Sequence, residues 1–182
     1  MKPIFTIHAG EYLVGSEIEK KLRGYNVWIP SKDSGIDLLV TNRNNTKTAS
    51  LQVKFSKDFN ATHVKEVFRP YIKGAGWWRL NRNKIKNSKA DLWVFILYSF
   101  QHKGQDYIII KPKDLLSLFS KTGRSEDTIH CYITVTNNKT VFETRGVNHK
   151  DMQLVCRNQY NNKIRNLKQY LNNWQPVTQK LK

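Results

Sequence analysis

Residues 35–56, GIDLLVTNRNNTKTASLQVKFS, contain the pattern that decides the fold. Residues 36–41 form a nearly continuous apolar run interrupted by Asp37, whereas residues 49–55 alternate between apolar and polar side chains. The residues between them, 42–48, are rich in turn formers and show no apolar periodicity. The stretch therefore predicts two β-strands joined by a polar turn.

Three polar side chains of this hairpin are candidates for chemistry. Strand side chains repeat every two residues, so Gln52 and Lys54 share one face of the second strand and its apolar side chains share the other. An acid at Asp37, opposite an amide oxygen and an ammonium group, is a suitable site for a divalent metal and a phosphate. The alternative is a hairpin whose polar residues simply face water.

The charge of the chain favours a polyanionic partner. The 182 residues include 31 Lys and Arg against 14 Asp and Glu, which gives a net charge of +17 and a pI near 9.9. Nucleic acid is the simplest partner, with an anionic membrane surface as the competitor. No stretch approaches the roughly 18 apolar residues of a membrane span, and residues 1–12 become acidic too soon for a secretory signal. Cys131 and Cys156 lack CxxC spacing, so we expect a reducing compartment.

A helix is predicted before the hairpin. Apolar spacing indicates a helix over about 9–23 that ends at Gly24, a favourable residue after a helix C-terminus. At roughly 100° per residue, Glu11 lies close to the apolar stripe and Glu17 lies on its other border. Either acid can face the sheet, or both are ordinary flanking residues. A strand at 25–29 follows.

Two basic segments follow the hairpin. Residues 57–89 carry nine Lys and Arg against two acids, with aromatic residues interleaved and a helix predicted over about 61–73. Residues 144–182 carry eight Lys and Arg against one acid. Such segments can hold phosphates and stack bases, or they are solvated faces whose aromatic side chains point inward. The predicted nucleic-acid contacts are Lys57, Lys65, Arg69, Lys73, Arg79, Arg82, Lys84, Lys86, Arg157, Lys163, Arg165 and Lys168.

The remaining elements mix strands and helices. Residues 91–99 are the most apolar run and predict a central strand. A strand at 106–111 and a short helix at 113–119, opened by a proline, come next. We expect a second hairpin over 129–144 and a basic helix over about 150–174. Because strands and helices do not alternate strictly, the sheet should be mixed and flanked by helices.

The order of these elements and their polar residues resembles the PD-(D/E)XK nuclease superfamily, which has the restriction-endonuclease-like fold. The matching pieces are GEYLVGSEIEKKLRGYNVWIP, GIDLLV and LQVKFS, and the resemblance covers about residues 9–98. It implies an α/β fold with a three-layer αβα core and a central mixed sheet, in the order αβββαβ. We expect one domain over 1–182, with a core at about 9–120 and a basic α+β extension of hairpin and helix at about 125–182.

The resemblance also implies an activity, Mg²⁺-dependent cleavage of DNA, with Mn²⁺ as a substitute ion. The enzyme would be a restriction-type or a structure-specific endonuclease, the latter like the Holliday junction resolvases. Asp37 is then the principal metal ligand, Gln52 binds through its side-chain oxygen, and the Val53 carbonyl is a further ligand. Glu11 binds the metal through water or through a second ion. Lys54 orients the attacking water and stabilises charge on the phosphate.

Two positions depart from the family pattern. Ile36 stands where proline is usual, and Gln52 stands at the second acidic position. Since glutamine carries no charge, metal binding depends more on Asp37 and on the helix acid, for which Glu17 is the alternative to Glu11. A catalytically weak or inactive nucleic-acid-binding module on the same fold is therefore the alternative function. A basic structural protein of a nucleoprotein assembly is a third, weaker interpretation.

Other chemistries lack their motifs. The five histidines show no HxxxH or HxH spacing, and the chain has no GxxxxGK phosphate loop. A serine or cysteine nucleophile has no local signature. We expect duplex or branched DNA as the partner, and a homodimer because cutting both strands needs two sites. We expect neither a membrane nor a small-molecule cofactor, and a cytoplasmic location.

Overall fold

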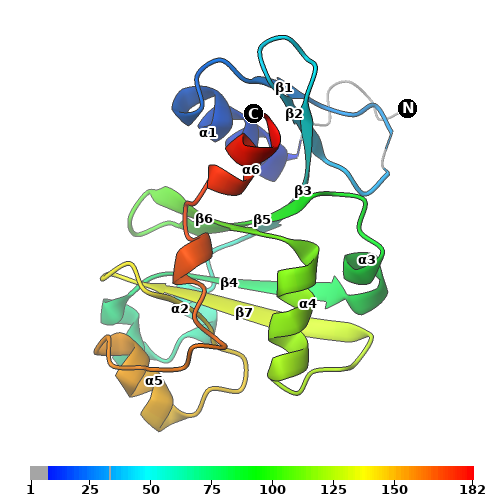
Figure 1. Cartoon of the computed structure of the whole chain (residues 1–182). Coiled ribbons are helices and arrows are strands. Elements are labelled where there is room, and N and C mark those ends of the chain that lie inside the picture. Colours follow the sequence, from blue (N-terminus) through cyan, green and yellow to red (C-terminus); the bar gives the residue numbers. More distant parts are fainter. Residues whose placement is uncertain (1–7, 33) are drawn as a thin grey trace.

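The central element of the fold is a mixed five-stranded sheet, sheet A, in the computed structural model, which describes residues 8–32 and 34–182 (Figure 1). The strand order is β1-β2-β3-β5-β6; β3 and β5 are parallel, and the other neighbours are antiparallel. The strands are β1 (Asn26–Trp28), β2 (Leu38–Thr41), β3 (Thr48–Ser56), β5 (Leu92–Ser99) and β6 (Gly104–Ile110). The predicted mixed α/β sheet is confirmed.

The hairpin predicted within residues 35–56 is formed by β2 and β3. Leu38 pairs with Leu51, and the pairing continues to the turn. Asn42 fixes the turn, because its side-chain oxygen accepts hydrogen bonds from the backbone N–H groups of residues 46 and 47. Since β3 is the longer strand, its second half extends beyond the start of β2.

Two helices cover one face of sheet A. The predicted helix at 9–23 is confirmed as α1 (Ala9–Lys21), and the chain turns at Gly24, whose φ of 90° suits glycine. Together with α6 (Gln175–Lys180), it packs on the apolar face of β3 and β5. The cluster that they share is Val14, Ile18, Leu38, Val40, Ala49, Leu51, Val53, Leu92, Val94, Ile96, Tyr107, Ile109, Trp174, Val177 and Leu181.

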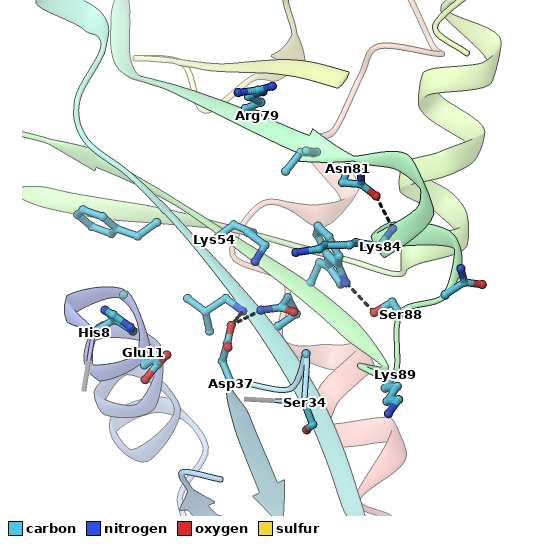
Figure 2. Close-up of a pocket in the computed structure, with 18 of the residues that line it drawn as sticks. His8, Glu11, Ser34, Asp37, Lys54, Arg79, Asn81, Lys84, Ser88 and Lys89 are labelled. Atoms are coloured by element: carbon cyan, nitrogen blue, oxygen red, sulfur yellow. Dashed lines mark hydrogen bonds between the residues drawn. The ribbon is translucent and has the colours of Figure 1, made fainter. Parts of the chain in front are cut away.

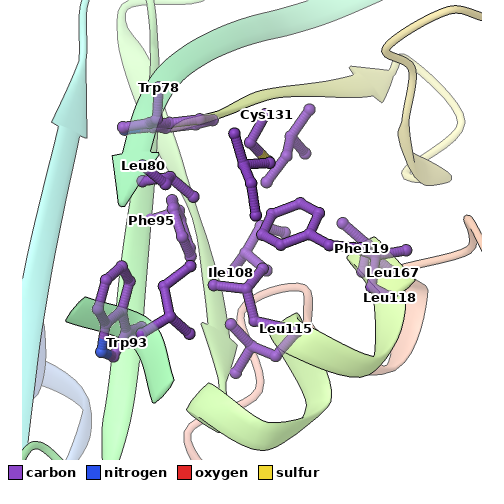
Figure 3. Packing of buried hydrophobic residues seen from close by; sticks show 14 of the residues in the cluster. Trp78, Leu80, Trp93, Phe95, Ile108, Leu115, Leu118, Phe119, Cys131 and Leu167 are labelled. Carbon is purple, nitrogen blue, oxygen red and sulfur yellow. The ribbon is translucent and has the colours of Figure 1, made fainter. Parts of the chain in front are cut away.

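A second sheet, sheet B, covers the other face, where the sequence predicts helices. It consists of β4 (Ile72–Asn81), β7 (Thr128–Thr136) and β8 (Val141–Glu143), in that order. Trp93, Phe95 and Leu97 of β5 face sheet B because strand side chains alternate. Figure 3 shows Trp78 of β4 against Phe95, with Phe119 entering from helix α4 (Pro112–Lys121). The predicted αβα layering is therefore corrected to helix, sheet and sheet, with α4 beside the second sheet.

The connection from β3 to β5 passes through sheet B, and the helix predicted over 61–73 is wrong. That segment contains a short helix α2 (Asn60–His63) and a 3₁₀ helix η1 (Glu66–Tyr71), followed by β4. Pro70 lacks a backbone N–H and disfavours a regular α-helix. Gly74 and Gly76 interrupt the apolar alternation by which a strand is recognised. Helix α3 (Arg82–Lys86) then leads back to β5.

The helix predicted over 150–174 is wrong beyond its first part. Helix α5 (His149–Cys156) ends early, and irregular structure with a 3₁₀ helix η2 (Lys168–Tyr170) leads to α6. Asparagines compete with helix formation there: Oδ1 of Asn162 accepts from the N–H groups of residues 164 and 165, and Asn158 and Asn172 adopt positive φ. No helix in the described part of the chain is long and apolar enough to cross a membrane.

The predicted division between a core at about 9–120 and an extension at about 125–182 is not a packing boundary. β7 pairs with β4 from one end to the other, and Val177 of α6 joins the cluster beneath α1. The hairpin predicted over 129–144 is confirmed as β7 and β8. Its first strand is therefore a central strand of sheet B and not part of an appendage.

Candidate active site

A cleft opens beside the second half of β3, past the point where β2 begins. Its volume is about 1010 Å³. Its walls are the start of α1, the residues before β2, the face of β3 toward sheet B, and the chain from the end of β4 through α3 (Figure 2). The residues predicted for metal binding and catalysis all line this cleft, namely Glu11, Asp37, Gln52, Val53 and Lys54. The fold thus brings together residues that lie far apart in the sequence.

Asp37 is held against β3 by both its backbone and its carboxylate. Its N–H donates to the Leu51 carbonyl at 2.8 Å. Its Oδ2 accepts hydrogen bonds from the Val53 N–H at 2.7 Å and from Nε2 of Gln52. The carboxylate thus continues the ladder of hydrogen bonds beyond the start of β2. Because the N–H and C=O of a strand residue lie on the same side, the Val53 carbonyl also faces this side of β3.

Gln52 and Lys54 project from β3 toward sheet B, as the strand alternation predicts, and both are half-buried. Nζ of Lys54 lies 5.2 Å from the centroid of the Trp93 ring, and the Trp78 indole donates to the Lys54 carbonyl at 3.1 Å. Nε1 of Trp93 donates to Oγ of Ser88 at 2.9 Å, which fixes the indole. This aromatic support orients the lysine. No pattern in the sequence assigns Trp93 to the site.

Glu11 is the helix acid that reaches the cleft. It lies in the first turn of α1 and is only 5% exposed. The helix approaches β3 so closely that a Cβ added to Gly10 would lie 2.9 Å from Cβ of Phe55. Glu17, the alternative, lies outside the cleft lining and pairs with Lys21 at 2.6 Å. The close contact at Gly10 therefore decides between the two acids.

Cations line the wall that faces β3. Lys84 and Lys89 lie there, and Arg79 of β4 also lines the cleft, at its edge next to the outer face of sheet B. Arg79 and Lys84 are both predicted nucleic-acid contacts. In Figure 2, Lys54 and Lys84 reach into the cleft from different walls. The prediction missed Lys89, although it closes the basic segment 57–89. This lining favours an anionic ligand.

Three other side chains that were predicted to contact nucleic acid form an ion pair or a hydrogen bond within the protein. Lys73 forms an ion pair with Asp106 at 2.7 Å. Arg69 and Arg82 each donate to a backbone carbonyl at 3.0 Å. These side chains have partners within the protein, and their contact with nucleic acid stays a prediction. The predicted contacts that are exposed and outside the cleft lining are Lys57, Lys65, Lys86, Arg157, Lys163 and Lys168.

Arg165 neutralises Glu143, the buried acid of β8. Glu143 is 0% exposed. Arg165 donates to its Oε2 at 2.6 Å, and Arg124 donates to its Oε1 at 2.8 Å. Burial raises the pKa of Glu143, although both guanidinium groups act in the opposite direction. Arg165 therefore has a structural role, and its contact with nucleic acid stays a prediction.

The donor set of the cleft fits a hard divalent cation. Among residues 8–32 and 34–182, no group of three or more His, Cys, Asp or Glu is placed to hold a metal. The predicted site therefore relies on the carboxylates of Asp37 and Glu11, the Gln52 amide oxygen and the Val53 carbonyl. All are oxygen donors, which Mg²⁺ and Mn²⁺ prefer. Because Nε2 of Gln52 faces Asp37, coordination by its Oε1 requires the amide to turn over.

Comparison of the chain with protein-family models, curated proteins and solved structures finds no match. The residues of the cleft are therefore the basis for assigning a function. They combine two carboxylates with the cations Lys54, Arg79, Lys84 and Lys89. The carboxylates suit a bound metal, and the cations suit a substrate that carries phosphate.

Proposed function

We propose that the protein is a divalent-metal-dependent DNA endonuclease of the PD-(D/E)XK type. The observation that carries this proposal is that Glu11, Asp37 and residues 52–54 line one cleft whose facing wall is cationic. Oxygen ligands for a metal, a lysine and a positive rim are the components that phosphodiester hydrolysis requires. Restriction-type and structure-specific, Holliday-junction-resolvase-like activities both fit this site.

The proposal includes a restriction-endonuclease-like core. Helix α1 precedes β1, β2 and β3, and β5 then joins β3 in parallel. This order agrees with the αβββαβ pattern, except that the crossover passes through sheet B where the pattern has a helix. These elements lie within the residues that the sequence resemblance covers, apart from the end of β5.

The cleft would hold Mg²⁺, or Mn²⁺ as its substitute, through Asp37 as the main ligand. The Val53 carbonyl, the Gln52 amide and Glu11 complete the donor set. When bound, such an ion lowers the pKa of a coordinated water and neutralises phosphate charge. Val53 keeps Asp37 in place before binding, because its N–H already holds the carboxylate at 2.7 Å.

Lys54 orients the attacking water and stabilises negative charge on the phosphate. Its ammonium group is held beside Trp93 and lies in the cleft with Asp37, where fixed charge acts without reorganisation. Arg79, Lys84 and Lys89 bind the phosphates next to the scissile bond. Such contacts position the DNA and carry no sequence information.

A catalytically weak or inactive nucleic-acid-binding module is the alternative function. The observation that favours it is Gln52, an uncharged residue at the second acidic position, which donates a hydrogen bond to Asp37. A cleft with one carboxylate fewer binds a divalent ion more weakly. The cationic wall would then hold DNA without cutting it.

Incubation of the protein with supercoiled plasmid, linear duplex and a four-way junction separates these functions. We expect nicking or linearisation that requires Mg²⁺ or Mn²⁺ and stops in EDTA. Discrete fragments from linear duplex indicate restriction-type specificity, and preferential cutting of the junction indicates a structure-specific enzyme. Salt-sensitive binding without cleavage in either metal would instead identify the binding module.

Cleavage of both duplex strands would also need a homodimer, since one such site cuts one strand. Trp28 at the end of edge strand β1 and the adjacent Ile29 are 51% and 46% exposed, and they offer a surface for a second copy. Light scattering on the purified protein measures its mass; a monomer that linearises plasmid in one binding event contradicts the dimer.

The free, buried cysteines Cys131 and Cys156 support a cytoplasmic location within the same proposal.

A further inference from the structure

The outer face of sheet B carries a row of aromatic and cationic side chains. Trp77 lies opposite Tyr132 in the β4–β7 register, and Arg79 lies opposite His130. Residues directly opposite in an antiparallel pair share a face. The intervening Trp78 is buried between the sheets, so the four flanking side chains lie on the outer face. None of the four is fully buried, and Arg79 is exposed.

Two of these rings form one flat platform. Nε1 of Trp77 donates to Nδ1 of His130 at 3.2 Å, and the two ring planes differ by only 4°, with centroids 5.8 Å apart. The indole N–H lies in the plane of its ring, so an acceptor in a parallel ring must lie close to that plane. The rings are therefore side by side rather than face to face. Phe59 packs edge-on at 5.5 Å from Trp77, and the His63 ring lies at 23° to the indole plane with its centroid 6.3 Å away.

The platform lies between two positively lined cavities. At one end, Arg79 lines the active-site cleft. At the other end, Tyr132 lines a second pocket of about 360 Å³, whose walls also include Lys65, Arg145 and His149. The Arg145 guanidinium lies 5.3 Å from the centroid of the Tyr132 ring. With a rise of about 3.4 Å per strand residue, the row from Arg79 to the pocket at residue 75 is about 14 Å long.

We propose that this face binds single-stranded DNA. A base stacks on the Trp77–His130 platform, Arg79 and Arg145 hold phosphates on either side, and the second pocket receives a neighbouring nucleotide. Bases of a single strand present free ring faces, whereas duplex bases cover one another, so the half-buried Trp77–His130 platform selects the single strand. The cations at both ends and the net charge of +17 favour a polyanion over a protein segment.

Single-stranded DNA can bind to this face whether or not the active-site cleft cleaves DNA. If the proposed function also holds, the row leads a single strand into the active-site cleft at Arg79. The preferred substrate would then be DNA with a single-stranded segment next to the cut, and this part of the proposal rests on the proposed function. Measurements in EDTA separate the binding proposal from the cleavage proposal, because without a divalent metal they report DNA binding alone.

Fluorescence anisotropy of labelled oligo-dT, oligo-U and a duplex of equal length, titrated in EDTA at several salt concentrations, tests the proposal. We expect oligo-dT to bind more tightly than the duplex. Trp77→Ala should weaken oligo-dT binding by about 5- to 150-fold, the loss of one stacked base, with the salt dependence unchanged. Arg145→Ala should instead reduce the slope of log K against log salt by about 0.7. The matched control Tyr12→Ala, at an aromatic residue of α1 that is 64% exposed, should change neither quantity.

Trp77 also contacts apolar neighbours, so each variant is checked by thermal unfolding. His130→Ala and Tyr132→Ala remove other parts of the row and should weaken binding even if Trp77→Ala does not fold. Wild-type affinity for oligo-dT in folded His130→Ala and Tyr132→Ala proteins would overturn the proposal. Tighter binding of the duplex, or binding of oligo-U without oligo-dT, would also overturn it. Asp37→Ala should bind oligo-dT normally, which separates a failed strand site from a failed nuclease site.

Discussion

The Asp37–Gln52 pair sets the charge of the candidate metal site. Asp37 accepts hydrogen bonds from Nε2 of Gln52 and from the Val53 N–H. A carboxylate at position 52 would repel Asp37 unless a cation lay between them. The amide therefore stabilises the metal-free cleft and lowers its affinity for a divalent ion.

Gln52→Glu tests this balance. We expect the variant to be less stable than the wild type in EDTA by about 1 kcal/mol, because its hydrogen bond to Asp37 is replaced by repulsion. It should gain more stability on addition of Mg²⁺, since a bound cation stabilises the folded state by mass action. Melting temperatures across an Mg²⁺ titration measure both effects. Equal Mg²⁺ responses of Gln52→Glu and the uncharged control Gln52→Ala would contradict a metal at this position.

Strand residues of the cleft were predictable from the sequence, and the helix acid was not. A strand has a two-residue period, so Gln52 and Lys54 had to share a face once residues 49–55 were recognised as a strand. Helical angles left both Glu11 and Glu17 beside the apolar stripe. The choice depends on the contact of Gly10 with β3, which is a tertiary contact with no local signal.

At the scale of helices and strands, the geometry of the site depends most on the contact between α1 and β3. A Cβ on Gly10 would lie 2.9 Å from Cβ of Phe55 and 3.3 Å from Cγ1 of Val53. The same strand carries Lys54, and the next helical residue is Glu11. The spacing between helix and strand therefore sets where the acid lies relative to the lysine and Asp37.

Gly10→Ala should move α1 away from β3. We expect a loss of about 1–3 kcal/mol in unfolding free energy, because the added Cβ meets strand atoms that cannot move aside freely. We also expect cleavage to fall by about tenfold or more through misplacement of Glu11. Urea unfolding and plasmid nicking measure the two effects.

Gly15→Ala is the matched control in the same helix. A Cβ there would lie 3.6 Å from Cγ1 of Val27, an ordinary contact. This variant should be neutral or more stable by up to about 1 kcal/mol, since alanine favours helix. Wild-type stability and cleavage in Gly10→Ala would show that the helix contact does not position the site.

Helices and strands with an uninterrupted pattern of apolar residues were predicted correctly. Elements whose pattern is interrupted by glycine or asparagine were not. The apolar run of β5 and the Pro112 start of α4 are strong local signals. In β4, Gly74 and Gly76 hide the alternation. In the C-terminal segment, local hydrogen bonds of asparagines such as Asn162 end the helix that the apolar residues indicate.

At the scale of the whole molecule, side-chain contacts of Asp91 hold the C-terminal helix α6 against sheet A. Lys180 of α6 forms an ion pair with Asp91, and Ser50 donates to it through its N–H and its hydroxyl, both at 2.9 Å. Partial burial disfavours the charged carboxylate, but these partners outweigh it and lower the pKa of Asp91 below 3.8. One side chain thus joins β3, β5 and α6.

Asp91→Asn should change the pH dependence of stability. Because the folded pKa is lower than the unfolded one, the ionised carboxylate stabilises the fold above about pH 4, and this contribution is lost as the pH falls through the folded pKa. The variant should be less stable at neutral pH by about 1 kcal/mol and should lose less stability toward acid. Urea unfolding from about pH 7 to about pH 3 measures this, with the exposed Asp127→Asn as control. Parallel pH profiles for Asp91→Asn and the wild type would contradict it.

The mixed sheet was predictable, whereas the layer on its second face was not. The pairing of β4 with β7 joins residues 47 to 64 positions apart, and such long-range pairing leaves no local pattern. A basic α/β protein with a site at the hairpin was therefore predictable, and the second sheet was seen only in the structure. That sheet supplies Arg79 and brings α3, with Lys84, to the wall of the cleft.

The most direct test of a nuclease site in this cleft is the rate of Mg²⁺-dependent plasmid nicking by Asp37→Ala and Lys54→Ala. With a net charge of +17, DNA binding alone does not identify the site, so binding in EDTA is measured beside cleavage. We predict that both variants lose at least about 100-fold in rate and still bind DNA. The exposed controls Glu19→Ala and Lys20→Ala on α1 should cut like the wild type. Nicking at the wild-type rate by Asp37→Ala or Lys54→Ala would contradict the assignment.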